Sequence, residues 1–135
     1  MPLGKAAVLY ALTVPVFFAV DMVWLGLVAK KLYARQIGHL MSAKVQWAPA
    51  LLFYFLFIAG ILVFVVLPAL SKGSPGRALL FGALFGLISY ATYDLTNLAT
   101  LRDWPLLIVV VDLGWGMVLT AAVSGASFWI ARRIL

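Results

Sequence analysis

The stretch WAPALLFYFLFIAGILVFVVLPAL, from Trp47 to Leu70, contains no charged residue and decides the fold class of this chain. A helix needs about 20 predominantly apolar residues to cross a bilayer, at a rise of ~1.5 Å per residue. Backbone N–H and C=O groups inside lipid must be hydrogen-bonded within the segment itself. We therefore expect this stretch to be a transmembrane helix.

Three further windows meet the same requirement, so four spanning helices are predicted, over about 6–29, 47–70, 75–98 and 105–130. The composition agrees, because 66% of the 135 residues are hydrophobic and 10% are charged, whereas the apolar share of a soluble domain is about one half. We predict an all-α integral membrane bundle of four transmembrane helices in up-down order. The whole chain, 1–135, is expected to form a single transmembrane domain.

Cap and turn residues support these boundaries. Ser74 followed by Pro75 is typical of a helix start, Asp103 shortly before Pro105 predicts a cap for the fourth helix, and Pro68 lies where the second helix is expected to end. The longest connection, residues 30–46, alternates charged and apolar side chains. This pattern favours an interfacial helix over an open loop.

The formal net charge of +6 is carried by short clusters of Lys and Arg beside the spans. We therefore expect membrane lipid, and not nucleic acid, as the partner. The absence of cysteine and the single histidine exclude disulfides and make a zinc site of the familiar kind improbable. No residue pattern indicates a cofactor.

The ten basic residues divide five and five between the two ends of the predicted bundle, so the positive-inside rule does not select an orientation. The cluster Lys30, Lys31, Arg35 and Lys44 favours a cytoplasmic first loop. The alternative is dual topology, with antiparallel dimers of one sequence. A homodimer is also compatible with the small interior volume of four short helices.

Three of the four acidic residues, Asp21, Asp94 and Asp112, lie inside the predicted spans. A carboxylate in hydrocarbon costs several kcal/mol unless it is protonated, paired or solvated, so each indicates a functional site. The up-down connectivity puts all three in the same half of the bilayer. We therefore expect them to converge on one acidic site that holds protons or a cation, because three like charges at short range in a low dielectric cannot all be ionised.

Side chains near the aspartates extend this predicted site. Tyr90, Asp94 and Asn97 share one helix face, and Trp24 and Trp115 follow Asp21 and Asp112 at the i, i+3 spacing. Tyr90 and Asn97 could instead provide hydrogen bonds that hold the helices together. The two tryptophans either fill core volume or offer π faces to a bound cation. The strings VDMVWLG and VDLGWGM resemble each other, which is weak evidence for an internal repeat.

Small residues predict where two helices approach closely. Gly82 and Gly86 form G-x-x-x-G, and a four-residue repeat from Asp112 through Gly116, Thr120 and Ser124 follows the fourth helix. We expect these two stripes to meet. Three tryptophans near the ends of the predicted helices, Trp47, Trp104 and Trp129, are interpreted as interfacial belt residues.

The run YATYDLTNLATLRDWP, Tyr90 to Pro105, together with VVDLGWG, Val110 to Gly116, and FVVLPAL, Phe64 to Leu70, resembles an uncharacterised bacterial family of small predicted membrane proteins known only as a domain of unknown function. The resemblance covers nearly the whole chain and brings no activity with it. It implies a four-helix, multi-pass protein of the bacterial inner membrane. It also implies that the family pattern includes Asp94, Asn97, Arg102, Asp103, Trp104 and Asp112.

Three hypotheses for the function follow. The first is a protein that binds or transports a cation or small molecule with proton coupling at the three aspartates, and the sequence favours it over an enzyme. The second is a membrane-embedded acid/base enzyme, of isomerase or cyclase type, acting on a lipid or isoprenoid. The third is a structural helper subunit. Arg102 and Asp103 are expected to pair in their loop, or to act as a gate to the site.

Overall fold

A computed structural model describes all residues of the chain, 1–135, and every regular element in it is helical. Four helical runs are long and apolar enough to cross a membrane, namely Leu3–Val28, Trp47–Ser71, Pro75–Thr100 and Leu106–Ile134. They coincide with the four predicted windows, with ends that differ by at most four residues. The chain is an all-α, four-helix membrane bundle.

Two of the four runs change their helical pitch on the way. The first consists of α1 (Leu3–Val23) and the π-helix η1 (Trp24–Val28), and the second of α3 (Trp47–Ile61), the π-helix η3 (Leu62–Val66) and α4 (Leu67–Ser71). Pro68 does not end this run as predicted. It lies in the first turn of α4 directly after η3, a position that tolerates its missing N–H. The other two runs are α5 (Pro75–Thr100) and α6 (Leu106–Ile134).

The helix predicted in the first loop is present but is shorter than the connection. It comprises α2 (Lys30–Ile37) and the 3₁₀ turn η2 (Gly38–Leu40), and no regular element follows until Trp47. The apolar side of α2 does not simply face outward. Leu32, Tyr33 and Ile37 pack against the cluster that contains Trp104 and Ile108 at the start of α6. The first loop therefore folds back over one end of the bundle.

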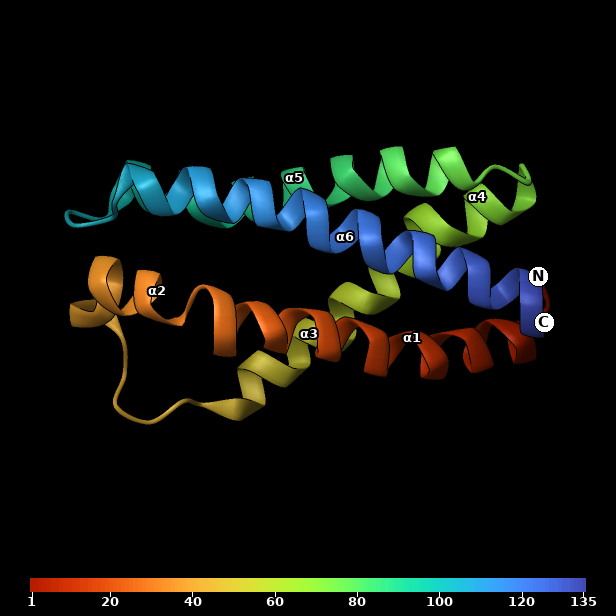
Figure 1. Cartoon of the computed structure of the whole chain (residues 1–135), viewed down its shortest axis with the longest axis horizontal. Helices are drawn as coiled ribbons and strands as arrows, with labels where there is room; N and C mark the ends of the chain where they lie inside the picture. Colours follow the sequence, from red (N-terminus) through yellow and green to blue (C-terminus); the bar gives the residue numbers. More distant parts are fainter.

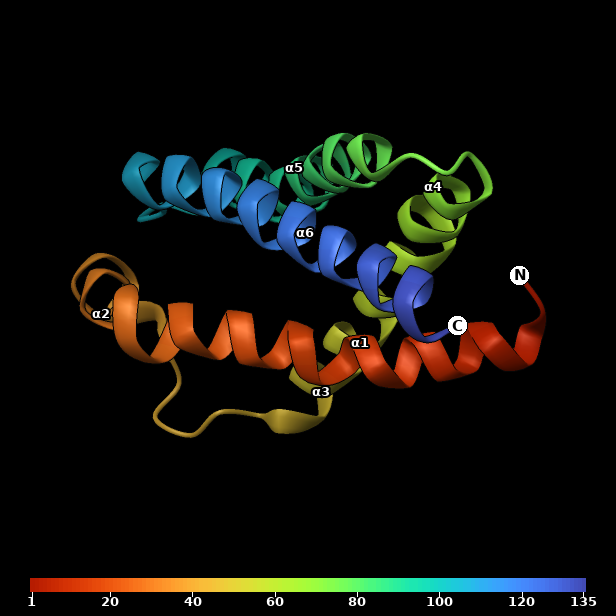
Figure 2. The same ribbon diagram turned by 45° about the vertical axis from the view of Figure 1, so that its right-hand side comes forward.

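The helices form two pairs that separate toward the α2 end. Figure 1 shows α5 and α6 lying side by side above α1, with α3 close to α1, and the turned view in Figure 2 agrees. Between the two pairs, α1 packs on α6, and η3 packs on both α5 and α6. Both chain termini lie at the end opposite to α2, where Lys5 Nζ donates to the Leu135 carbonyl at 3.1 Å.

The predicted close approach of the third and fourth spans is confirmed. A Cβ on Gly86 would collide with the backbone oxygen of Gly116, and a Cβ on Gly82 would lie 2.8 Å from Ser124 Oγ. Only residues without a side chain allow α5 and α6 to pack at this distance. The small-residue stripes therefore hold together the rigid pair that carries Asp94 and Asp112.

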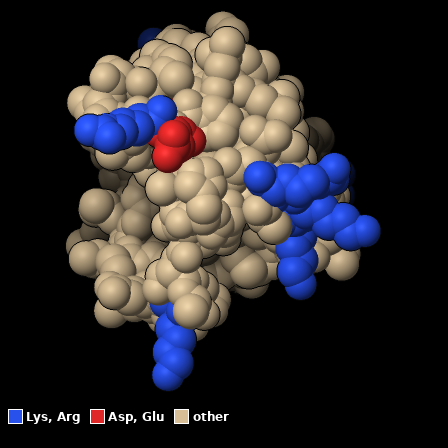
Figure 3. All heavy atoms as spheres, turned by 90° about the vertical axis from the view of Figure 1, so that its left-hand side faces the viewer, with Lys and Arg blue, Asp and Glu red and all other residues tan.

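The two expected helix caps have different outcomes. Ser74 Oγ accepts from the Arg77 N–H at 3.1 Å, so the cap of α5 is confirmed. The cap expected from Asp103 is wrong, because α6 begins at Leu106 with Pro105 as the N-cap residue and no side-chain cap. Asp103 points instead toward His39 Nε2, at 3.9 Å, across the end of the bundle. Figure 3 shows this end, with basic side chains spread over it and one acidic side chain among them.

The hydrophobic core fills the half of the bundle that contains the termini. Its buried members come from α1, from residues 57–66 of the second run and from the later part of α6, and include Leu9, Phe17, Ile61 and Val123. Thr13 and Ser127 share a buried hydrogen bond of 2.8 Å there. The opposite half, beneath α2, holds the aspartates.

Candidate functional site: an aromatic cavity with two aspartates

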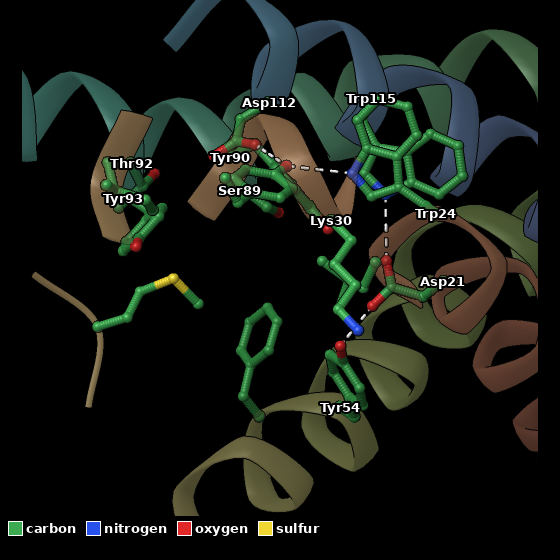
Figure 4. A pocket seen from close by; sticks show the side chains of 15 residues that line it. Asp21, Trp24, Lys30, Tyr54, Ser89, Tyr90, Thr92, Tyr93, Asp112 and Trp115 are labelled. Atoms are coloured by element: carbon green, nitrogen blue, oxygen red, sulfur yellow. Dashed lines mark hydrogen bonds between the residues drawn. The ribbon is translucent and has the colours of Figure 1, made fainter. Parts of the chain in front are cut away.

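A cavity of about 820 Å³ occupies the half of the bundle beneath α2. Its walls come from every spanning run and from α2, and about half of its 15 lining side chains are aromatic. Asp21 from the first run and Asp112 from the fourth both line it, as do Lys30, Ser89 and Thr92. Figure 4 shows these side chains converging on one space. The cavity thus joins charged groups that are 91 residues apart in the chain, from 21 to 112.

Both carboxylate oxygens of Asp21 accept hydrogen bonds from other helices. Trp115 Nε1 of α6 donates to Oδ1 at 3.1 Å, and the Tyr54 hydroxyl of α3 donates to Oδ2. The side chain is 3% exposed. Asp21 therefore ties three helices together at the cavity wall, and its charge is met by neutral donors instead of a cation.

Asp112 is held by a residue of the loop helix. The Tyr33 hydroxyl of α2 donates to Asp112 Oδ1, and Trp24 Nε1 donates to the same hydroxyl at 3.1 Å. Tyr33 lies outside the spans, and its burial, reinforced by the bond to Asp112, raises the pKa of its hydroxyl above the ordinary value. The hydroxyl therefore stays protonated, and so remains a donor, across the physiological pH range.

Trp24 and Trp115 stack on one another between the two aspartates. Their ring centroids are 4.5 Å apart, and the ring planes differ by 7°. Each tryptophan lies one turn after the aspartate of its own run, but its N–H group points toward the aspartate of the other run. Trp115 donates directly to Asp21, and Trp24 donates to the Tyr33 hydroxyl, which in turn donates to Asp112. The two similar strings VDMVWLG and VDLGWGM therefore lie side by side in the fold, and each supplies the tryptophan that faces the aspartate of the other.

Asp94 lies behind the cavity and does not line it. Its side chain is fully buried, and Oδ1 accepts from Trp104 Nε1 at 3.3 Å, while Oδ2 has no hydrogen-bond partner. The carboxyl groups of Asp94 and Asp112 are neighbours in the interior of the bundle. The predicted group of three is therefore arranged as two aspartates on the cavity and a third behind one of them.

Trp104 corrects the interpretation of the tryptophan belt. Trp47 and Trp129 are exposed, but Trp104 is buried with its indole N–H on Asp94. The reason is that α2 covers this end of the bundle and removes Trp104 from the surface.

The remaining predicted site residues lie in different surroundings. Tyr90 lines the cavity, whereas Asn97, seven residues further along α5, is half-buried outside it. The pair expected between Arg102 and Asp103 is not present, because the one ion pair within 4 Å joins Asp103 to His39. Arg102 is exposed and does not line the cavity. Adjacent residues in a tight turn project in different directions, which explains why they do not meet.

Among the lining residues that sequence reasoning missed, three bear on the charge and hydrogen bonding of the site: Tyr33, Tyr54 and Lys30. Tyr54 is the only tyrosine in the second span, and its distance from Trp47 places it in the half of the bilayer that holds the aspartates. Lys30 directly follows the first span, so its long side chain reaches back along the helix to line the cavity. Tyr33 had no comparable signal, because only the folding of α2 onto α6 brings it to Asp112.

The donors of the cavity do not form a metal centre. Nowhere does the chain gather three His, Cys, Asp or Glu side chains in an arrangement that could hold a metal ion. Calcium takes six to eight oxygen ligands and magnesium needs an octahedral set. Asp21 and Asp112 are held instead by phenol and indole donors.

One comparison with known proteins gives a match. A family model described as "Predicted membrane protein (DUF2177)" matches residues 6–129, which include every residue that lines the cavity. No curated protein and no solved structure matches the chain.

Proposed function

The chain belongs to this family of predicted membrane proteins, and we propose that it binds a small organic cation in the cavity between Asp21 and Asp112, with proton exchange at these carboxyl groups. The observation that carries the proposal is that two carboxyl groups from different helices line one cavity inside a membrane bundle. Ionisable residues at such positions are costly, and they mark ligand or proton sites.

The charge balance of the cavity favours a cation. Two carboxyl groups line it against a single ammonium group, that of Lys30, and neither aspartate has an ion-pair partner within 4 Å. A bound ligand with one positive charge would offset the second carboxylate. Asp21 and Asp112 could each receive it on the side that faces the cavity.

The size and lining of the cavity favour an organic ligand. Cavities that hold small molecules usually measure about 300–1,000 Å³ and are lined mainly by apolar and aromatic groups, and this cavity measures about 820 Å³. Trp24, Trp115 and Tyr90 lie beside the carboxyl groups in Figure 4. Aromatic faces attract organic cations. The same lining, and the absence of a metal-binding cluster, argue against a hard metal ion.

Asp94 supports the proton exchange. Its carboxyl group is a neighbour of that of Asp112 and has a free oxygen, Oδ2, so we infer that a proton passes between the two groups when the ligand changes the charge of the cavity. Desolvation and mutual repulsion prevent two neighbouring carboxyl groups from both being ionised. Asp94 would then hold the proton that Asp112 releases.

The packing of the rest of the bundle supports binding more than transport. The half that contains the termini is filled by the hydrophobic core, with Leu9, Phe17 and Val123 fully buried. Transport would require this half to open as well. Because all four spans are helices, the membrane in a bacterium would be the inner one, since outer-membrane proteins span as β-barrels.

A membrane-embedded enzyme is the second candidate, and one observation favours it. Each aspartate on the cavity holds a tyrosine hydroxyl, Tyr54 on Asp21 and Tyr33 on Asp112, which gives two pairs suited to moving a proton to or from a lipid substrate. A purely structural role, the third hypothesis, would not account for the cavity.

Ligand titrations in lipid nanodiscs test the binding proposal. Long-chain amines should quench the fluorescence of Trp24 and Trp115, and Asp21→Asn and Asp112→Asn should each weaken binding about tenfold or more, which corresponds to ~1.4 kcal/mol. Asp103→Asn is the matched control, because Asp103 is exposed and lies outside the cavity. Equal affinity in all variants would refute the site, whereas conversion of an added lipid by the wild type alone would support the enzyme.

A further inference from the structure

The walls of the cavity are not equally closed. Between the two helix pairs, η3 packs against α5, but α3 itself packs on α1 and has no comparable contact with α5. Figures 1 and 2 both show α3 on the α1 side of the bundle, apart from α5. The two helices thus form a wedge that is closed at η3 and widens toward the α2 end.

Aromatic packing closes the narrow end of the wedge. Phe57 of α3 stacks on Phe85 of α5 with centroids 5.5 Å apart and planes within 12°. A Cβ on Gly60 would lie 3.0 Å from the ring of Phe85, so no space remains beyond this point. The cavity therefore ends there and extends only toward α2.

Two lining residues at the edges of the wedge are exposed although they lie within spans. Phe53 of α3 is 47% exposed and Tyr93 of α5 is 53% exposed, and both line the cavity. Each lies six or seven residues inside the end of its helix, which is about 10 Å at ~1.5 Å per residue. At this depth of a spanning helix, the bundle is surrounded by the hydrocarbon core of the bilayer. The cavity therefore opens between α3 and α5 into the bilayer.

The water side of the cavity is covered by the loop helix. Tyr33 and Ile37 of α2 line the cavity and also pack against the Trp104 cluster, which holds α2 across this end. The bond from Tyr33 to Asp112 fastens the same helix to α6.

We propose that the ligand enters from the bilayer between α3 and α5, and that it is a lipophilic amine, with one hydrocarbon chain and an amino group that reaches Asp21 and Asp112. This inference rests on the proposed function and names its ligand class. The neutral amine dissolves in the bilayer, and in the cavity its nitrogen takes a proton from a carboxyl group, which gives an ammonium ion paired with a carboxylate. The chain lies along the apolar lining and Phe53.

Single cysteines test the route of entry, because the native chain has none. Phe53→Cys and Met41→Cys both alter residues that line the cavity, one at the lipid opening and one in the loop that follows η2 at the water side. Leu52→Cys is the control, since Leu52 neighbours Phe53, is 68% exposed and does not line the cavity. Each variant is labelled with a bulky maleimide in nanodiscs. The rate at which dodecylamine passes from bilayer to protein is then measured.

We expect the label at position 53 to slow this transfer about tenfold, corresponding to ~1.4 kcal/mol in the barrier, while labels at 41 and 52 leave it nearly unchanged. Slower transfer with the label at 41 but not at 53 would overturn the lateral route. In that case a loss of binding in Asp21→Asn would show that the proposed binding site stands. Unchanged binding in Asp21→Asn would overturn both the route and the proposed function.

Discussion

The aspartates of this bundle differ in how many of their oxygens have a donor. Asp21 has donors on both oxygens, whereas Asp94 has one on Oδ1 and none on Oδ2. A buried polar atom that loses its only partner costs about 1–3 kcal/mol. The loss of stability caused by substituting a donor residue therefore depends on which carboxylate oxygen loses its hydrogen bond.

Tyr54→Phe should reduce the stability of the protein by about 1–3 kcal/mol, because it removes the donor to Asp21 Oδ2 and leaves a buried carboxylate oxygen unpaired. Tyr90→Phe is the matched control in the same cavity, since the Tyr90 hydroxyl bonds to no protein group and its loss should cost less than about 0.5 kcal/mol. Unfolding of both variants in mild detergent measures the difference. Equal costs would contradict the assigned role of the Tyr54 hydroxyl.

Asp94→Asn should leave stability within about 0.5 kcal/mol of the wild type. The amide oxygen can still accept from Trp104 Nε1, and the new NH₂ group can donate to the carboxyl group of Asp112. Asp94→Leu removes the acceptor of the Trp104 N–H and should cost about 1–3 kcal/mol. Thermal unfolding of the two variants, which are of similar volume, separates hydrogen bonding from packing. An Asn variant as unstable as the Leu variant would argue against the Asp94–Asp112 contact.

Among the elements, α5 and α6 form the rigid part of the bundle, and α1 and α3 are arranged around it. Glycine allows the backbones of α5 and α6 to approach, and the stack of Trp24 of η1 on Trp115 joins the first run to this pair. The cavity exists because α3 follows α1 instead of closing on α5. The shape of the site is therefore a property of helix packing more than of any one side chain.

Gly116→Ala should destabilise the protein by about 1–3 kcal/mol, as expected when a methyl group is forced into a packed interface. The added Cβ would lie 2.5 Å from the Tyr90 ring and 3.0 Å from the Gly86 oxygen. Gly114→Ala, two residues away in α6, is the control. Its Cβ would meet nothing within 4 Å, and alanine should be more stable in the helix by about 0.5–1 kcal/mol. Unfolding curves that rank the variants in the opposite order would refute the close contact of α5 and α6.

At the scale of the whole molecule, the bundle has two unlike halves, a packed one at the termini and a hollow one beneath α2. The basic residues do not mark this difference, since five lie at each end. The orientation of the hollow half in the membrane is therefore sensitive to small changes of charge. If both orientations occur, antiparallel dimers become accessible, as predicted for dual topology.

Replacing Lys72 and Arg77 by serine reduces the basic residues at the terminal end from five to three, while the α2 end keeps five. We expect a larger fraction of molecules with the α2 end in the cytoplasm, because Lys and Arg are retained on that side. Serine at Lys30 and Lys31 should act in the opposite direction. A C-terminal reporter that is active on only one side of the membrane measures the fractions, and Asp103→Asn serves as the control because acidic residues contribute little. An orientation that neither double variant shifts would contradict charge control.

Particular residues show how far the sequence could predict the site. Asp21, Asp112, Trp24, Trp115 and Tyr90 were predicted as site residues, and all five line the cavity. An acidic residue inside an apolar span is costly in any arrangement of the helices, so the sequence identifies it as a candidate site residue before any contact is known. The role of Tyr33 could not be found this way, because a tyrosine in a loop is not unusual and only the folding of α2 brings it to Asp112. Nor could the sequence show that Asp94 lies behind the cavity, because that position depends on how the helices pack.

The sequence alone determined the four spans, the serine cap of α5, and the half of the bundle in which the aspartates lie. These follow from hydropathy and from a fixed rise per residue, which are local along the chain. Only the tertiary structure decided that α2 folds onto α6, that α3 leaves α5, and that Asp94 is separated from the cavity. The reason is physical: the sides of an apolar helix are nearly equivalent toward lipid, so the choice of partner depends on shape complementarity between helices distant in sequence.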